Sequence, residues 1–545
     1  SEKFAFMNWV IERWGVRANV TAGYGKKDFL REAIQELSKE AEFKRTYGHL
    51  GWVCKDGSWL YLFSGGAISK DGPIENFNVD LHDSKLKDYQ FPTLDSNEEL
   101  AASIRASLSI LGLTPPRIAY PVLAATYCAP LGEMHPIDFS LALYGITGRG
   151  KTQLAALAQA HFGAKFHGKH LPGNWSSTAN ALEKQSFLAK DAIFTVDDFA
   201  PQQTQGEAAK LNHSAERLFR SQGNRSGRGR LNSDMKARAE YFPRGLILST
   251  GEDLPKTQSI RARLLIIEFD EGDVSFDELT PLQKAASDGV FAKAMGGYIG
   301  WLASRVPQLK AKLPERHHEL RREFSSTKTH RRAPEIAASL LVAFETFLDF
   351  AVEQNAVEPD DARGYRGTMN QALASAIESQ EPFQASEDPA IRFLSLIGGA
   401  LISGRAYLAD ARTGGAPHDA GRFGWRINGC LLMGRDETPS DTYEPRGARI
   451  GWVGDAELLL DPDAAFAAAQ NLAREQKNEL SISEMTLWKQ LAEKGFILRG
   501  ERRNTIRRTV KGDRPYVLVF PNREVFTEKG SAVSTVSTFT DETGL

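Results

Sequence analysis

The chain has 545 residues and a formal net charge of −2, with a composition that is typical of folded globular proteins. Its length predicts roughly three to four domains, and the near-zero charge excludes a uniformly basic nucleic-acid-binding protein, so any such surface has to be local. No apolar stretch reaches the roughly 18 residues of a membrane span, and Cys54, Cys128 and Cys430 form neither a metal motif nor a disulfide framework. We therefore expect a cytoplasmic protein with no membrane partner.

Residues 1–120 are predicted to form an N-terminal α+β domain. The segment KKDFLREAIQELSKEAE (26–42) has the spacing of an amphipathic helix, and GHLGWVCKDGSWLYLF (48–63) is typical of two strands joined by a tight turn. Another helix is expected near 97–112. A hydrophobic core explains the tryptophans of the hairpin better than a DNA contact does.

The next predicted domain, 121–280, contains a glycine-rich turn between an apolar run and a helix. The stretch GITGRGKT (145–152) satisfies G-x-x-x-x-G-K-[ST], in which backbone N–H groups and a helix N-terminus converge on phosphate oxygens. Lys151 is the candidate for the β- and γ-phosphates, and Thr152 for Mg²⁺, so ATP and Mg²⁺ are the expected cofactors. The residues assigned to nucleotide binding are Gly145, Gly148, Arg149, Gly150, Lys151, Thr152 and Gln153. A glycine-rich surface turn, the alternative, does not explain the flanking strand and helix.

An acid pair, Asp197 and Asp198, follows the apolar run 192–196. Two carboxylates at the end of a buried strand are costly unless they face a cation or water. Asp197 is the second candidate ligand of Mg²⁺, and Asp198 is the candidate that orients and polarises the attacking water. A solvated acid pair that opens a loop is the alternative.

Two further polar signals follow. The apolar run 246–248 leads to Thr250, which is placed to sense the γ-phosphate, and Arg261 and Arg263 precede a fourth apolar run. An arginine there reaches the ATP of a neighbouring subunit and stabilises the transferring phosphate, whereas a solvated pair is the alternative. This order of P-loop, acid pair, polar strand end and arginine is that of an AAA+ ATPase core, which implies a ring.

An arginine-rich segment, 215–240, separates the acid pair from Thr250. Its portion GNRSGRGR has the glycines of a hairpin tip, and a loop of this kind projecting into the pore of a ring can hold DNA phosphates. The candidates for DNA contact are Arg225, Arg228, Arg230 and Lys236. A solvated basic loop, or arginines that contact ATP across a subunit interface, are the alternatives.

Residues 281–380 are predicted to form a helical lid or linker. Arg331 or Arg332 begins a strongly apolar helix at the position expected for a sensor 2 arginine, and a charge that merely flanks the helix is the alternative. His317 and His318 have no further ligands at metal spacing, so we interpret them as a solvated helix face.

The C-terminal part is predicted to contain a small β-containing connector (381–465), a winged-helix domain (466–525) and a disordered tail (526–545). A helix near 484–494 precedes two strands joined by a basic turn, and residues 480–520 have nine Lys and Arg against four Asp and Glu. This local charge favours nucleic acid, although a winged helix can also mediate protein contacts. The candidates for DNA contact are Arg503, Arg507, Arg508 and Lys511. The predicted fold class is thus α/β, an AAA+ P-loop core with flanking α+β and winged-helix domains.

The segments LPGNWSSTANALEKQSFLAKDAIFTVDDFAP, RSQGNRSGRGRLNSD and GLILSTGEDLPKTQSIRARLL together resemble the MCM-like replicative helicases of bacterial mobile elements, including those of the staphylococcal cassette chromosome and of phages. The resemblance runs from about residue 45 to about residue 520, and its N-terminal region matches only in type. It implies a hexameric, ATP-driven helicase that moves on single-stranded and forked DNA with 3′–5′ polarity. A primase or an initiator of the same element is a candidate partner.

By position, the functional residues of that family fall on Lys151 and Thr152 (P-loop), Asp197 and Asp198 (carboxylates), Thr250 (sensor 1) and Arg263 (arginine finger). GNRSGRGR falls near the pre-sensor hairpin. Two departures are that Asp198 stands where MCM proteins have Glu, although superfamily 3 viral helicases also use a double Asp, and that Thr or Ser stands where sensor 1 is usually Asn.

The predicted function is ATP-dependent translocation of DNA through a ring during replication of a mobile element. An AAA+ remodeller or loader that acts at DNA without unwinding is one alternative. A non-enzymatic DNA-binding regulator whose oligomeric state is set by ATP is another, and the intact acid pair argues against it.

Overall fold

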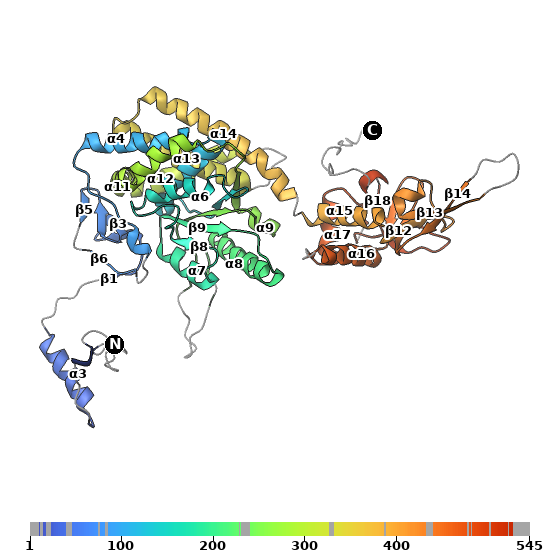
Figure 1. Ribbon diagram of the computed structural model, residues 1–545, viewed down its shortest axis with the longest axis horizontal. Helices are drawn as coiled ribbons and strands as arrows, with labels where there is room; N and C mark the ends of the chain where they lie inside the picture. The colour runs from blue at the N-terminus through green and yellow to red at the C-terminus, as the bar shows by residue number, and fades with distance from the viewer. Residues whose placement is uncertain are drawn as a thin grey trace, which may run out of the picture.

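The computed structural model describes residues 10, 15–17, 23–39, 46–74, 77–81, 85–227, 229, 240–325, 332–385, 388–431, 440–476, 479–480, 482–500, 503–521 and 523–526. Their buried hydrophobic side chains form two large clusters, one over 50–377 and one over 390–526, which correspond to two separate bodies in Figure 1. Helix α3 (Lys26–Leu37) has no buried residue. No helix in the described part of the chain has the length and hydropathy needed to cross a membrane.

An antiparallel sheet forms the N-terminal part of the larger body, in the order β2 (Gly51–Lys55), β3 (Ser58–Phe63), β4 (Gly66–Ser69) and β5 (Gly72–Ile74). The predicted hairpin is confirmed, since β2 pairs with β3. Trp52 is buried and its indole N–H donates to Pro130 O at 2.6 Å, so it is a core residue. Two short strands, β1 (Thr46–Tyr47) and β6 (Asn78–Val79), pair in parallel beside this sheet.

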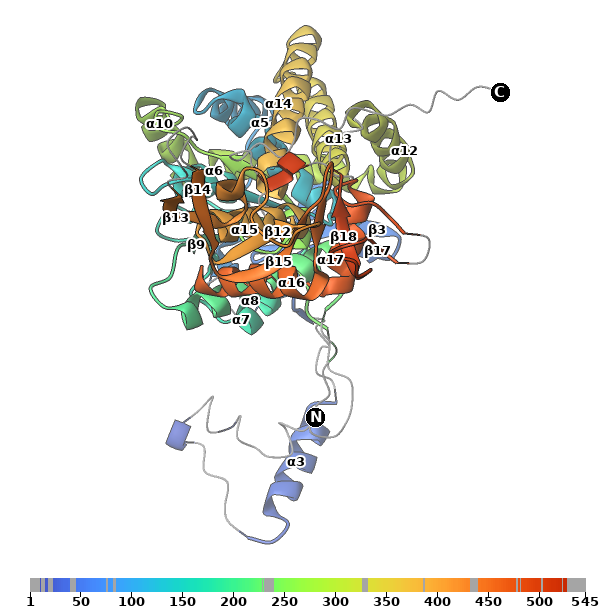
Figure 2. The same cartoon turned by 90° about the vertical axis from the view of Figure 1, so that its right-hand side faces the viewer.

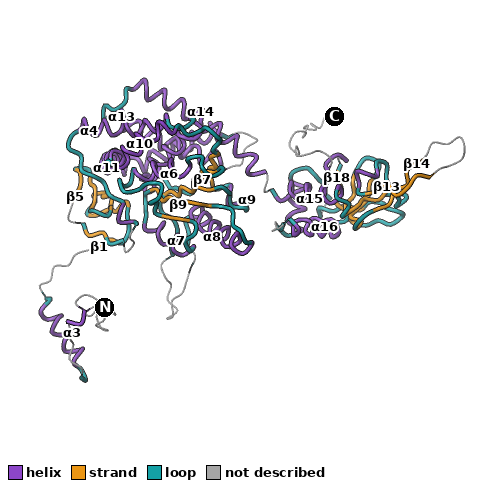
Figure 3. The backbone as a smooth tube through the Cα atoms, in the orientation of Figure 1, coloured by secondary structure: helices purple, strands orange, loops and turns teal. Residues whose placement is uncertain are grey.

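A five-stranded parallel sheet lies at the centre of the larger body (Figure 3). Its strand order is β11-β7-β10-β9-β8. The strands are β7 (Ser140–Tyr144), β8 (Gly173–Asn174), β9 (Ile193–Phe199), β10 (Leu246–Gly251) and β11 (Leu264–Glu268). All four pairings are parallel, so the carboxyl ends of all strands share one edge. Most residues of these strands are buried because helices cover both faces of the sheet. This architecture confirms the α/β class and is consistent with a P-loop ATPase core.

Helices cover the sheet and extend from it. They are α4 (Asn97–Leu108), α5 (Pro116–Cys128), α6 (Lys151–Ala160), α7 (Ala179–Leu188), α8 (Gln205–Asn224), α9 (Gln258–Arg261), α10 (Phe276–Ser287), α11 (Val290–Ala303), α12 (Val306–Phe324), α13 (Arg332–Glu353) and α14 (Pro359–Ala385). The expected helix near 97–112 is present as α4 followed by a 3₁₀ turn. Helix α13 is buried on most of its faces and packs against α5, α12 and α14, which explains its apolar sequence.

The smaller body faces the viewer in Figure 2. Its mixed sheet has the order β12-β15-β16-β18-β17. The elements are α15 (Pro389–Ile402), β12 (Ala406–Asp410), β13 (Trp425–Leu431), β14 (Ser440–Pro445), β15 (Ala448–Val453), β16 (Leu458–Leu460), α16 (Pro462–Glu475), α17 (Glu484–Glu493), β17 (Ile506–Arg507) and β18 (Tyr516–Phe520). Strands β13 and β14 form a separate hairpin.

This sheet crosses the expected boundary between a connector and a winged-helix domain. Strand β16, which lies before residue 466, pairs with β18, and β18 also pairs with β17 to form the expected β-hairpin after α17. One hydrophobic cluster likewise contains residues from α15 to β18. Pairing between β16 and β18 joins strands that are far apart in the chain, so local sequence patterns did not reveal it.

Candidate functional site

The glycine-rich loop joins the carboxyl end of β7 to the amino end of α6. Gly148 and Gly150 both have φ of 81°, a left-handed conformation that favours glycine. A Cβ on Gly150 would lie 2.7 Å from Val274 Cγ2, and a Cβ on Gly145 would lie 2.7 Å from Phe269 O. The segment after β11 therefore packs directly against the loop, and side chains at these positions would push it away.

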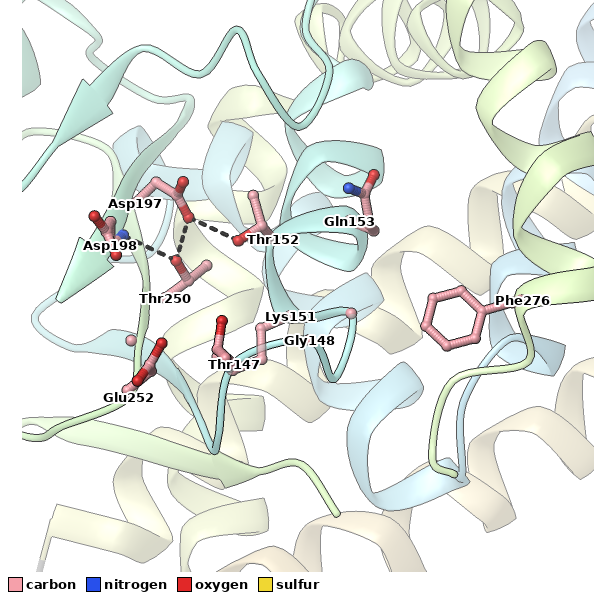
Figure 4. Close-up of a pocket in the computed structure, with 12 residues that line it drawn as sticks. Thr147, Gly148, Lys151, Thr152, Gln153, Asp197, Asp198, Thr250, Glu252 and Phe276 are labelled. Atoms are coloured by element: carbon pink, nitrogen blue, oxygen red, sulfur yellow. Dashed lines mark hydrogen bonds between the residues drawn. The ribbon is translucent and has the colours of Figure 1, made fainter. Parts of the chain in front are cut away.

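A cavity of about 300 Å³ lies over this loop (Figure 4). It is lined by Thr147, Gly148, Gly150, Lys151, Thr152, Gln153, Asp197, Asp198, Thr250, Gly251, Glu252 and Phe276. The structure thus brings together the predicted loop, acid pair and polar strand end, which come from three strands. Gly145 and Arg149 do not line the cavity; Arg149 Nη1 instead donates to Phe269 O at 2.7 Å.

Three side chains share hydrogen bonds at the carboxyl edge of the sheet. Thr152 Oγ1 donates to Asp197 Oδ1 at 3.0 Å, and Thr250 Oγ1 donates to the same oxygen (Figure 4). The Asp198 backbone N–H donates to Thr250 Oγ1 at 3.2 Å. Thr250 reaches both acids because β10 lies between β7 and β9 in the sheet. A hydroxyl and a carboxylate oxygen side by side are the ligand types that Mg²⁺ prefers.

Lys151 is buried at the first position of α6. Its Nζ donates to Gly145 O at 2.7 Å and to Ile146 O at 2.8 Å, so the ammonium group lies inside the curve of the loop. Burial lowers the pKa of Lys151, while the nearby carboxylate of Glu252 opposes this shift. A partly desolvated ammonium group inside a glycine-rich loop is suited to a multiply charged anion.

Asp198 differs from Asp197 in backbone conformation and in exposure. It has φ of 71°, which is unusual for a residue with a side chain, and the residue as a whole is more exposed than Asp197. Partial burial of the carboxyl group raises the pKa of Asp198, and the charges of Asp197 and Glu252 raise it further. A carboxylate with a raised pKa is a better proton acceptor than an ordinary aspartate.

Four residues of the cavity were not predicted as site residues from the sequence: Thr147, Gly251, Glu252 and Phe276. Glu252 adds a third carboxylate and follows β10 in the stretch STGEDLP, where a second acid at a strand end was the available signal. Phe276 begins α10 and is 58% exposed. It lies far along the chain from the loop, so no local pattern pointed to it.

Arg263 lies at the opposite edge of the sheet from the cavity. Its carbonyl oxygen accepts from Ser140 N–H, at the amino end of β7, with a distance of 3.0 Å. At about 3.3 Å per residue, β7 separates this point from the glycine-rich loop by roughly 15 Å. The guanidinium group of Arg263 therefore does not reach the cavity of its own chain.

The last turn of α8 positions the Arg263 side chain. Arg263 Nη2 donates to Asn224 Oδ1 at 3.0 Å, and Nη1 donates to Ser259 O. A Cβ on Gly223 would lie 2.5 Å from Arg263 Cδ, so the side chain lies directly on the Gly223 backbone. The arginine before β11 is thus in contact with α8, whose second half forms the start of the arginine-rich segment.

Other arginines surround Arg263. Burial lowers the pKa of Arg263, and the positive charges of Arg332 and then Arg220 lower it further, while Asp138 opposes them. Arg332, at the start of α13, therefore lies close to Arg263. It does not line the cavity of its own chain, where a sensor 2 arginine acting within one subunit would lie. Arg331 lies outside the described residues.

Arg261 has a different environment from Arg263. It is 8% exposed, and its Nε donates to Pro255 O at 2.7 Å. Its Nη1 donates to Phe383 O at 2.9 Å, which ties α9 to the end of α14. These contacts give Arg261 a role in holding its own chain together, so Arg263 is the better candidate for a contact between subunits.

The DNA-contact candidates of the arginine-rich segment are only partly described. Arg225 is exposed and ends α8 with a left-handed φ of 49°. Arg228, Arg230 and Lys236 lie outside the described residues.

The candidates of the β17–β18 hairpin fall into two groups. Arg503, Arg507 and Lys511 are exposed, and the guanidinium groups of Arg503 and Arg507 lie 5.7 and 4.7 Å from the centre of the Tyr516 ring. Arg508 instead forms an ion pair with Glu457, with Nε and Oε1 2.6 Å apart. Its charge is therefore largely neutralised within the chain, unlike those of its neighbours.

Comparisons with known proteins identify a shared fold. No family model and no curated protein matches this chain. A solved structure titled "SCCmec type IV Cch - active helicase" is similar over 93% of this chain and 85% of its own, with a TM-score of 0.56 and 14% sequence identity. The expected resemblance to the staphylococcal cassette-chromosome helicases is thus confirmed at the level of the fold.

Proposed function

We propose that this protein is an ATP-dependent DNA helicase that acts as a ring of subunits, most simply a hexamer. The observation that carries the proposal is the hydrogen-bonded set of Thr152, Asp197 and Thr250 beside the buried Lys151, in one cavity. Similarity of fold to a structure titled as an active helicase supports strand separation as the use of the hydrolysis energy.

In this proposal, the N–H groups of the glycine-rich loop and Lys151 bind the triphosphate. Thr152 and Asp197 hold Mg²⁺, whose charge offsets that of the phosphate oxygens when it is bound. The donor set fits such an ion, because a hydroxyl and a carboxylate meet at 3.0 Å within the cavity. Thr250 keeps the Asp197 carboxylate oriented through its own hydrogen bond.

Asp198 is the proposed proton acceptor. It orients a water molecule whose oxygen attacks the γ-phosphorus, and it takes the proton as the bond to the bridging oxygen breaks, which yields ADP and inorganic phosphate. The hydrogen bond from the Asp198 N–H to Thr250 Oγ1 holds Asp198 beside Thr250, whose hydroxyl also binds Asp197. The negative charges of Asp197 and Glu252 increase its affinity for the proton.

Each site takes its arginines from a neighbouring subunit in this proposal. Arg263 lies at the edge of the sheet remote from its own cavity, and Arg332 and Arg220 lie close to it. The positive charges of Arg332 and Arg220 act on Arg263 more strongly than the negative charge of Asp138 does, and a guanidinium group in this environment is suited to an anion. The triphosphate of the adjacent subunit is such an anion, which is why we propose a ring.

Single-stranded and forked DNA is the proposed substrate. Arg225 and the segment that follows α8 would contact the strand in the pore, and Arg503, Arg507 and Lys511 offer a second basic surface. Because Arg508 is paired with Glu457, we leave it out of this surface. Replication of a mobile element, with 3′–5′ movement and a primase or initiator as partner, is the proposed setting.

The decisive experiment is ATP-dependent unwinding of forked duplexes and of duplexes with a single 3′ or 5′ tail. We expect unwinding from the 3′ tail, lost in Lys151→Ala. Hydrolysis without strand separation would contradict the helicase proposal and favour a remodeller or loader. ATP binding without hydrolysis would favour an ATP-switched DNA-binding regulator.

A further inference from the structure

Phe276 is an exposed aromatic side chain in the wall of the cavity. Its relative exposure is 58%, although large apolar side chains are usually withdrawn from water. Among the described residues, no other aromatic ring or cation contacts it. Figure 4 shows the ring at the end of the cavity opposite the acid pair, with the glycine-rich loop between them.

The segment that carries Phe276 is firmly held. Arg117 Nη2 binds both carboxylate oxygens of Asp273, at 2.9 and 2.7 Å. Val274 is buried against Gly150 of the loop, and the Ser275 N–H donates to Leu113 O at 3.1 Å. Phe276 is thus exposed on a braced segment whose position relative to the phosphate loop is set by direct contacts.

A second contact links α10, the helix that begins at Phe276, to α6, the helix that follows the glycine-rich loop. Gln283 of α10 donates from Nε2 to Gln153 Oε1 at 2.8 Å, and Gln153 is itself part of the cavity wall next to Thr152. The two helices α6 and α10 are therefore joined on the side of the cavity that holds Phe276. Ring and amide together line a part of the cavity that has no carboxylate.

We propose that Phe276 stacks on the nucleobase of the bound nucleotide. This inference rests on the proposed function, because the phosphates have to occupy the glycine-rich loop for the base to reach Phe276. With the γ-phosphate beside Asp198, the triphosphate runs along the loop and its base emerges at the opposite end, where the exposed ring lies. Stacking buries the exposed face of the ring.

The test compares two ligands: ATP and inorganic tripolyphosphate. Their dissociation constants are measured by calorimetry on the full chain, in the presence of Mg²⁺. In Phe276→Ala we expect ATP to bind about tenfold more weakly, as for the loss of one base–aromatic stack. Tripolyphosphate, which has no base, should bind as to the wild type, and Phe276→Tyr should retain the affinity for ATP.

Phe29→Ala is the matched control, since Phe29 is also exposed, at 65%, but lies on α3 away from the cavity. An unchanged affinity for ATP in Phe276→Ala would overturn the inference. So would an equal loss for ATP and tripolyphosphate, since Phe276 would then support the loop and not the base. In both cases the proposed ATPase function would remain supported if the wild type binds ATP and Lys151→Ala does not. A wild type that binds neither ATP nor tripolyphosphate would overturn both proposals.

Discussion

The two edges of the central parallel sheet differ in chemistry. The carboxyl edge has a buried lysine inside a glycine-rich loop and three carboxylates, Asp197, Asp198 and Glu252. The amino edge has Arg263 with Arg332 and Arg220 nearby. One edge is suited to a triphosphate with its metal ion, and the other to the negative charge that develops during phosphate transfer. Since the strand length keeps them apart within a chain, the comparison predicts a site completed by two subunits.

The largest expected effect comes from the amino edge. Arg263→Ala should lower the turnover of ATP about 1,000-fold, as for the loss of an arginine finger, with little change in ATP binding. Mixing this variant with Lys151→Ala should restore part of the activity, because some interfaces then combine an intact loop with an intact Arg263.

Phosphate release by the single and mixed variants measures this effect. Arg363→Ala, whose side chain is 74% exposed on α14, is the control and should behave as the wild type. A failure of the mixture to exceed the sum of its components would show that both edges serve the same subunit.

Asp198→Asn tests the carboxyl edge. The amide cannot take up the proton of the attacking water, so turnover should fall about 100-fold or more. ATP should still bind, because Lys151 and the loop are intact. Parallel measurements of phosphate release and ATP affinity separate the two effects, and normal hydrolysis by this variant would refute the role of Asp198.

A smaller loss is expected when the contact between α8 and Arg263 is disturbed. A Cβ at residue 223 would lie 2.5 Å from Arg263 Cδ, and the flexible side chain would move first. Gly223→Ala should therefore lower turnover by up to about 100-fold through misplacement of the guanidinium group. Gly206→Ala is the matched control on the same helix, since a Cβ there meets nothing within 4 Å. Equal activity of the two variants would argue against this positioning contact.

The smallest effect concerns pH. Hydrolysis needs the carboxylate form of Asp198, whose pKa is raised by partial burial, Asp197 and Glu252. Turnover should therefore decline on acidification at a higher pH than an ordinary aspartate would give. Glu252→Gln removes one negative charge and lowers the pKa of Asp198, so the decline should move to lower pH.

Profiles of turnover against pH for the wild type, Glu252→Gln and the exposed control Glu358→Gln measure this shift. Coincident profiles for all three would show that another group controls the acid limb.

The sequence alone determined the elements that depend on neighbouring residues. The apolar run, the glycines and the Lys-Thr pair predicted the strand, loop and helix around Lys151, because each is a local pattern of periodicity and backbone freedom. The acid pair was expected directly after a strand that ends at Val196. The structure extends β9 to Phe199, so both acids lie within the strand, near its carboxyl end. The hairpin after α17 was likewise visible in the sequence.

Only the tertiary structure decided which distant residues meet. Strand order placed Thr250 between the loop and the acid pair, and it left Arg263 at the far edge, on the backbone of Gly223. Packing also gave two arginines that are two residues apart different environments: Arg261 is buried, while Arg263 is partly accessible. Phe276 entered the cavity wall by the packing of Val274 on Gly150. These outcomes depend on pairing and packing between segments far apart in the chain, which local patterns of charge and hydropathy do not encode.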